Sequence, residues 1–139
     1  MSGGYLPKPR DGWLLGVDVS TFQGEITAEL AAQLAAYEAR FVFARAVHGT
    51  TPDRQYTNTI ETCSAAGLMV GAYGVLTPKG DADEQARAFV ERFEAHPLDL
   101  APALDFETAG GLLASDALSR ARRWPAAWQT ASRAACSGP

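Results

Sequence analysis

The segment Ala101-Pro-Ala-Leu-Asp-Phe-Glu107 is a short apolar run that ends with two carboxylates one residue apart. Side chains of a β-strand alternate between its two faces, so a strand here would place Asp105 and Glu107 on the same face. Two neighbouring acids repel each other, which raises the pKa of one of them and provides a proton donor near neutral pH. Paired carboxylates of this kind carry out glycoside hydrolysis, and a strand end with two solvated acids fits the segment alone equally well.

Similar apolar runs occur three times before this segment, and each of the three is followed by residues with helical spacing. Strand-then-helix units of roughly thirty residues are typical of βαβ crossovers, which produce parallel strands with helices outside. We therefore predict an α/β fold, a parallel βα repeat of about four units that forms part of a TIM-like barrel. The predicted strands span 14–20, 41–47, 68–76 and 101–107.

Capping residues and helix breakers bound the predicted helices. Thr27 is a suitable N-cap for a first helix that runs through Arg40. Gly67 is a suitable left-handed cap for the end of the second helix, and Pro97 stops the third. A last helix opens at Ser115, and we expect Pro125 to break or restart it. The stripes of the first three helices are Leu30, Leu34 and Tyr37, then Tyr56, Ile60 and Cys63 after a cap at Asp53, then Ala86, Phe89, Val90 and Phe93 after acids at Asp81 and Asp83.

Composition places the chain among globular proteins and argues against a nucleic-acid-binding protein and a membrane-spanning protein. The 139 residues are 47% hydrophobic and carry a net charge of −4, which suits one core and gives no basic stripe for nucleic acid. The densest basic stretch, 120–123, is better explained as a solvated helix face. No apolar run reaches the ~20 residues of a membrane span, and residues 1–10 lack the apolar core of a signal peptide.

Cysteine and histidine offer no metal or nucleophile motif. Cys63 and Cys136 lie far apart and have no histidine at ligand spacing, so we expect no metal site and no cofactor, and two free thiols. A disulfide between them stays an open alternative. His48 could face a cleft but is more simply a surface or capped residue, and His96 is expected in a loop.

Polar residues gather near the ends of the predicted strands. In parallel α/β folds the carboxyl ends of the strands form the active site, because every strand delivers its following loop there. Each residue taken alone has a structural explanation, such as an ion-pair partner for the arginine. Burying several carboxylates beside one arginine for structure alone would be costly, so their combination favours a functional cleft. The candidates are Asp18, Arg45, Tyr73, Asp105 and Glu107.

Five motifs in order make the chain similar to the glycoside hydrolase family 25 lysozymes. The resemblance implies an N-acetylmuramidase that cleaves the β-1,4 bond between N-acetylmuramic acid and N-acetylglucosamine in peptidoglycan, on a modified barrel. The motifs are Gly16-Val-Asp-Val-Ser20 with Gln23-Gly24, Phe41-Val-Phe-Ala-Arg-Ala46, Ala66-Gly-Leu-Met-Val-Gly-Ala-Tyr73, Gln85-Ala86 and Ala103-Leu-Asp-Phe-Glu107.

The resemblance also implies roles for single residues. Glu107 would be the general acid that protonates the leaving glycosidic oxygen. Asp105 would orient the acetamido group or stabilise positive charge at the anomeric carbon. Asp18 would keep the electrostatic potential of the site negative. Tyr73 would border the sugar, with Arg45 and Gln23 as further substrate contacts.

The motifs end near Gly110, and the strands that would complete the barrel do not follow. We therefore expect a truncated form, with a leader at 1–12, one incomplete glycosidase-like domain at 13–135 and a tail at 136–139. A half barrel has open edges, which predicts self-association or a weakly stable monomer whose core is covered by the last helix and its two tryptophans. The alternative function is an inactive remnant that at most binds wall glycan. Without a recognisable signal peptide, the chain would act on the wall after release, as an endolysin does, or extracellularly.

Overall fold

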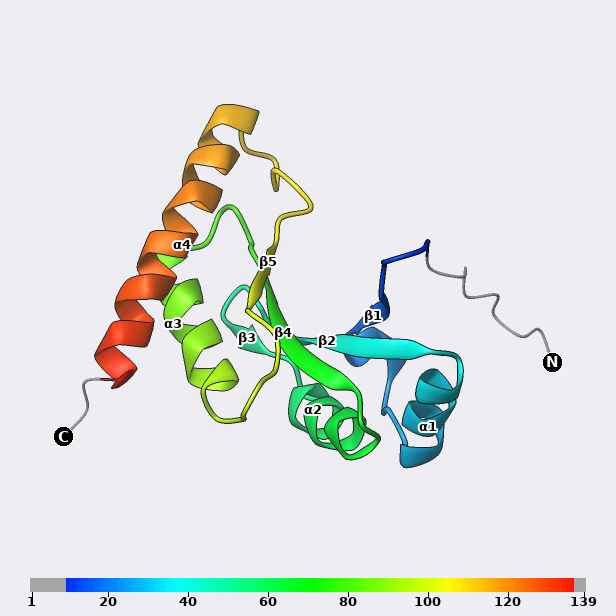
Figure 1. The fold of residues 1–139 in the computed structure, drawn as a ribbon. Coiled ribbons are helices and arrows are strands. Elements are labelled where there is room, and N and C mark those ends of the chain that lie inside the picture. The colour runs from blue at the N-terminus through cyan, green and yellow to red at the C-terminus, as the bar shows by residue number, and fades with distance from the viewer. Residues whose placement is uncertain (1–9, 137–139) are drawn as a thin grey trace.

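The sheet is built from parallel strands in the order β1-β2-β4-β5, and a short strand, β3, pairs antiparallel with β2 (Figure 1). The computed structural model describes residues 10–136, and only the backbone for 130–136. The strands are β1 Leu15–Val19, β2 Ala39–His48, β3 Thr51–Pro52, β4 Met69–Val75 and β5 Ala103–Asp105; the helices are the 3-10 turn η1 Thr21–Gln23, α1 Ala28–Ala36, α2 Tyr56–Ala65, α3 Ala82–Phe93 and α4 Ala114–Cys136.

Strands and helices alternate along the chain, and the sheet curls as part of a βα barrel, as predicted (Figure 1). α1 and α2 lie beneath the sheet, while α3 lies at its other end with α4 packed outside it. Alternation along β2 sends Val42 and Ala44 into the core on the helix side. Phe41 and Phe43 point to the opposite, inner face of the sheet and are half-buried.

Aromatic rings on the inner face lie directly over strand glycines. A Cβ added at Gly16 would come within 2.0 Å of the Phe41 ring, and one added at Gly71 within 2.6 Å of the Phe43 ring. A glycine within a strand lets a neighbouring group approach closely, and at these two positions that group is an aromatic ring. The rings therefore shield part of the inner face.

Two of the predicted helix patterns are confirmed. Ile60 and Cys63 of α2 are buried, and so are Phe89 and Val90 of α3. α2 ends in a Schellman motif, because the Gly67 and following N–H groups bond back to the last turn and Gly67 has a φ of 82°.

The prediction for α1 was wrong in length and partly wrong in face. The helix ends at Ala36 instead of continuing to Arg40, because Glu38 adopts a left-handed φ of 66° and β2 starts directly after it. Ala31 is the buried residue of this helix, whereas Leu30 and Tyr37 are exposed. Leu34 is partly buried against the core, as predicted, so the expected stripe is right at this residue and wrong at Leu30 and Tyr37.

The expectation that Pro125 breaks the last helix was also wrong, because α4 continues through it. A helix-interior proline costs roughly 3 kcal/mol, so packing must hold both halves in place. The Trp124 ring lies 5.2 Å from that of Phe89, and the Trp128 ring 6.4 Å from that of Phe93. The two tryptophans therefore cover apolar surface, as predicted, and do so on α3.

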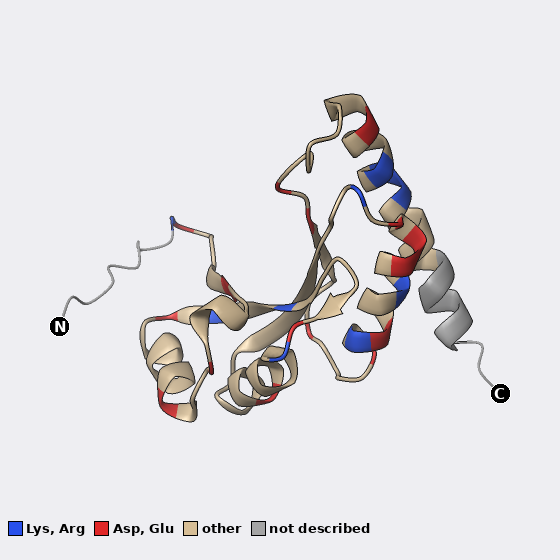
Figure 2. Cartoon of the chain, turned by 180° about the vertical axis from the view of Figure 1, so that it is seen from behind, with Lys and Arg blue, Asp and Glu red and all other residues tan. Residues whose placement is uncertain are grey.

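The remaining sequence expectations concern the sheet edges, the surface and the ends of the chain. β1 and β5 each have one strand neighbour among the described residues, so both outer edges of the sheet are open. Figure 2 shows basic positions on α4 beside acidic positions on α3, and residues 120, 122 and 123 are exposed as expected. No helix in the described part is long and apolar enough to cross a bilayer. The leader up to residue 9, the Cys136 side chain and residues 137–139 lie outside the described part.

Candidate active site

A cavity of about 420 Å³ lies over the inner face at the carboxyl ends of the strands. It brings together four of the predicted site residues, and we call it the acid cavity. Phe43, Ala103 and Leu104 complete its wall, and of these Phe43 could have been inferred because it shares a strand face with Arg45. The four predicted residues in its lining are Asp18, Tyr73, Asp105 and Glu107.

Asp105 and Glu107 meet in the acid cavity, although not in the way that strand alternation predicted. β5 ends at Asp105, so Glu107 lies in the exposed loop after the strand. The loop still brings the Glu107 side chain to that of Asp105, and a hydrogen bond between them is one cause of the raised pKa of Asp105. Partial burial, this hydrogen bond and the charge of Glu107 raise the pKa of Asp105 to about 6. The predicted proton-holding pair is therefore present, and Asp105 is the member whose pKa is raised.

Tyr73 provides the floor between the acids. Burial, opposed by Arg45 and reinforced by Asp18 and Asp105, raises the pKa of its phenol to about 12, so the hydroxyl stays protonated and can donate a hydrogen bond. Asp18, on the edge strand β1, is exposed and borders the other side of the cavity. The three acids and the phenol therefore face one volume of solvent.

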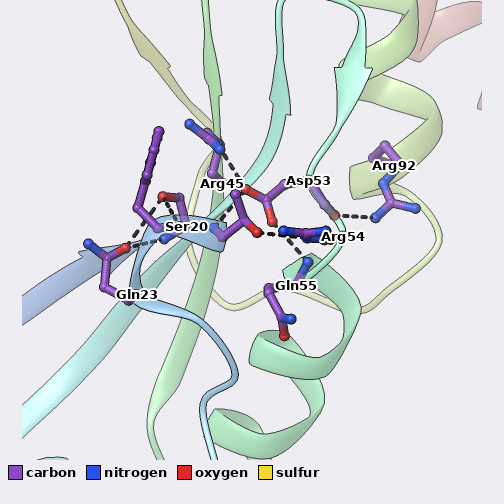
Figure 3. A network of polar contacts seen from close by, with 9 residues as sticks. Ser20, Gln23, Arg45, Asp53, Arg54, Gln55 and Arg92 are labelled. Carbon is purple, nitrogen blue, oxygen red and sulfur yellow. Dashed lines mark hydrogen bonds and ion pairs between the residues drawn. The ribbon is translucent and has the colours of Figure 1, made fainter.

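Arg45 does not line the acid cavity. Its side chain is buried, and its Nε donates to Oδ2 of Asp53 at 2.9 Å (Figure 3). Asp53 was expected to cap α2, but its Oδ1 accepts from the N–H of Gln55, one residue before the helix, while Oδ2 accepts from Arg45 and from Thr21 N–H at 3.0 Å. Of the two interpretations that the sequence allowed for Arg45, the structure places it as an ion-pair partner.

A set of hydrogen bonds around this pair, which we call the Asp53 network, ties four segments together (Figure 3). Arg92 of α3 donates to the carbonyl oxygen of Asp53 at 3.0 Å, and Arg54 Nε donates to Thr21 Oγ1 at 3.1 Å. The network joins η1, β2, the loop before α2 and α3. Sequence reasoning missed Asp53 as an organising residue because its partners are distant in the chain.

Gln23 is also outside the acid cavity. It forms a capping box with Ser20: its Oε1 accepts from Ser20 N–H at 2.7 Å, while Ser20 Oγ accepts from Phe22 N–H. Gln23 is exposed. Its position in the structure is that of a residue that holds the turn after β1.

Gln85, which belongs to one of the quoted motifs, fixes the loop between β4 and α3. Its side chain is almost fully buried, accepts from Thr77 N–H at 2.9 Å and donates to the Thr77 carbonyl at 3.0 Å. One residue before Thr77, the N–H of Leu76 donates to the Asp105 carbonyl at 2.9 Å. Gln85 thus helps to position the residue that carries the raised pKa.

The remaining reactive side chains lie elsewhere. His48 is exposed at the end of β2, and His96 contacts Thr57 Oγ1 through Nε2 at 3.2 Å in a loop. Cys63 is a buried free thiol whose pKa is raised by burial. Among the described residues, no group of three or more His, Cys, Asp or Glu side chains is arranged to hold a metal ion.

The sequence model of glycosyl hydrolases family 25 matches residues 17–136, which is most of the chain. This chain belongs to glycosyl hydrolase family 25. The family match continues past Gly110, where the quoted motifs end, and includes α4. The family therefore covers both the acid cavity and the helix that packs outside α3.

Solved structures show the same fold. A muramidase from Trichobolus zukalii is 24% identical with a TM-score of 0.71, and the match covers 84% of this chain and 60% of that one. A family 25 glycosyl hydrolase from Bacillus anthracis is 20% identical with a TM-score of 0.73, covering 94% and 62%. The modular autolysin LytC from Streptococcus pneumoniae, solved with a synthetic peptidoglycan ligand, is 14% identical with a TM-score of 0.61, covering 86% and 30%. No curated protein sequence matches the chain. The chain thus spans about 60% of the length of the first two of these relatives.

Proposed function

We propose that this family 25 member is a lysozyme-like glycoside hydrolase that cleaves the β-1,4 linkage between N-acetylmuramic acid and N-acetylglucosamine in peptidoglycan. The observation that carries the proposal is the hydrogen-bonded pair of Asp105 and Glu107 in the acid cavity, with Asp18 across from it. The fold shared with a muramidase, and with an autolysin that was solved with a peptidoglycan ligand, supports the same substrate class.

In this proposal the pair divides the work of an acid-catalysed glycosidase. Glu107, on the exposed loop, donates the proton to the leaving glycosidic oxygen. The two acids share one proton through their hydrogen bond. When Glu107 holds and donates that proton, the glycosidic C–O bond breaks and Asp105 is a carboxylate that orients the acetamido group or faces the developing positive charge. Addition of water at the anomeric carbon completes the hydrolysis. Asp18 adds negative charge, and the neutral Tyr73 hydroxyl borders the sugar.

Clearing of a suspension of bacterial cell walls tests the activity. Wild-type protein should reduce the turbidity and release reducing ends, and Glu107→Gln should lower the rate by about 10²- to 10⁴-fold, since it removes the general acid. Glu91→Gln, which neutralises an exposed acid on α3, is the matched control and should leave the rate unchanged. A Glu107→Gln protein that clears walls at the wild-type rate would refute the assignment of this residue.

The alternative is an inactive family member that binds wall glycan through the same cavity. It is motivated by the open edges of the sheet and by the 60% span of the relatives. Sedimentation with insoluble peptidoglycan, without release of reducing ends, would identify this function. Reducing ends that depend on Glu107 would exclude it.

Assembly and place of action complete the proposal. The open edges of β1 and β5 present unpaired backbone groups, which favours self-association of the chain. Light scattering on a size-exclusion column should therefore show a mass above 14.8 kDa, or aggregation, and a stable compact monomer would argue against it. The protein would act on the wall from outside the cytoplasm, after release or export.

A further inference from the structure

An unusually exposed aromatic side chain stands at the same edge of the sheet as the acid cavity. Phe22 lies in η1, three residues after the end of β1, and 84% of its surface is accessible. Single exposed apolar side chains are common on protein surfaces, so the exposure of Phe22 matters here only together with its position and its fixed backbone. Its position after β1, at the carboxyl ends of the strands, makes a ligand of the active-site edge the relevant occupant.

The turn that carries Phe22 is held firmly. Phe22 N–H donates to Ser20 Oγ at 3.2 Å within the capping box of Ser20 and Gln23. Thr21 is fixed on its other side by Asp53 Oδ2 and by Arg54. These bonds fix the backbone on both sides of Phe22, so little backbone entropy remains to be lost when the ring binds a ligand.

Arg45 supports one face of the ring. Its guanidinium carbon lies 5.3 Å from the Phe22 centroid, while the Asp53 carboxylate holds the guanidinium from behind. One face of the Phe22 ring is therefore next to the Arg45 guanidinium, and the rest of the ring is accessible to solvent. Because Arg45 itself is buried, it acts as a positioning residue for Phe22.

Strand register relates this ring to the acids. Arg45 pairs with Tyr73 on β4, and Tyr73 pairs with Ala103 on β5, two residues before Asp105. The spacing of neighbouring strands puts the Arg45 and Asp105 strands roughly 10 Å apart laterally. Phe22, next to Arg45, therefore lies toward the β1–β2 side of the site, and the acid pair lies toward β5, an arrangement that suits two different sugar rings of one chain.

We propose that Phe22 is the stacking platform of a distal glycan subsite, which receives a sugar ring of a wall glycan chain whose scissile linkage lies at Asp105 and Glu107. This inference rests on the proposed function for its substrate class. The apolar C–H face of a β-linked hexosamine packs on an aromatic ring, and a rigid ring with one face backed by a cation suits that contact. The subsite gives the protein a preference for longer chains over disaccharides.

Binding by glycan length tests the subsite. Peptide-free wall glycans fractionated to disaccharide and octasaccharide are titrated calorimetrically into Glu107→Gln protein, which prevents turnover. Adding Phe22→Ala should weaken octasaccharide binding about five- to tenfold and leave disaccharide binding unchanged, because truncating a buried anchor costs about 1 kcal/mol or more. Phe22→Trp should restore binding.

Tyr37→Ala is the matched control, since Tyr37 is an aromatic residue with 60% exposure at the far end of α1. It should change neither affinity. Equal octasaccharide affinities with and without Phe22, a loss that is the same for both chain lengths, or no octasaccharide binding at all would overturn the subsite.

The outcomes separate the two proposals. Wall clearing by the wild type, with octasaccharide affinity indifferent to Phe22→Ala, would remove the subsite and leave the hydrolase. A length-dependent loss on Phe22→Ala, with no wall clearing by the wild type, would support the subsite and remove the hydrolase.

Discussion

The acid cavity and the Asp53 network lie at the same edge of one sheet and treat charge in opposite ways. In the network, the Asp53 carboxylate is almost fully buried and accepts from Arg45, Thr21 and Gln55. In the cavity, Asp18 and Glu107 are exposed, and Asp105 has another acid as its hydrogen-bond partner. Charge that is fully compensated stabilises the fold, and charge left without a counter-ion is available for chemistry.

Removing the central acid of the network should have the largest effect on stability. Asp53→Ala leaves the Arg45 guanidinium buried without its partner and frees Thr21 N–H, so unfolding should become easier by about 3–5 kcal/mol. Urea denaturation followed by circular dichroism measures this loss. The double variant Arg45→Met with Asp53→Ala should recover part of the stability, and a single variant within about 1 kcal/mol of wild type would contradict the role assigned to the network.

The acid cavity should respond to pH through Asp105. Carbon-13 NMR of the Asp105 carboxyl should show an apparent pKa of about 6, and Glu107→Gln should lower it while burial keeps it above the usual value near 3.9. Because the folded pKa is the higher one, Asp105 contributes stability below pH 4 that is lost as pH rises through about 6. Wall clearing should decline over the same rise, since the pair loses its proton. An Asp105 that titrates near 4 in the wild type would remove the proton-holding pair.

Breaking an exposed ion pair should have the smallest effect on stability, and it gives a reference for the effect of breaking the buried pair of Arg45 and Asp53. Arg123 of α4 contacts Asp83 of α3 at 3.1 Å, with 69% and 42% of the two side chains accessible. Arg123→Ala should change the free energy of unfolding by no more than about 0.5 kcal/mol. If Arg123→Ala lowered the free energy of unfolding as much as Asp53→Ala does, the packing of α4 on α3 would depend on this ion pair more than on Trp124 and Trp128.

Local patterns in the sequence were enough to predict most of the architecture. Alternation and helical spacing gave the parallel strands, and the buried stripes of α2 and α3 were correct because large apolar side chains mark those faces. The prediction for α1 was right at Leu34 and missed Ala31 and Ala35, because buried alanines carry little pattern signal. α4 continued through Pro125 because tertiary packing outweighed a local penalty.

The site residues also divide into those that a local pattern predicts and those that depend on contacts distant in the sequence. Asp18, Tyr73, Asp105 and Glu107 were found from their places at strand ends, a rule that parallel topology enforces. Arg45 and Gln23 share those places, and only coordinates could show that one pairs with Asp53 and the other closes a capping box. The long-range partner of a polar side chain has no local signature in the sequence.

Phe41 over Gly16 and Phe43 over Gly71 have a consequence for anyone who would redesign this domain. Each glycine leaves room for a phenylalanine ring from the neighbouring strand β2. A methyl group at either glycine would have to displace that ring, so each glycine and its phenylalanine would have to be changed together. Both rings come from β2, an interior strand, so a redesign that changes either glycine also changes how β2 packs on the inner face.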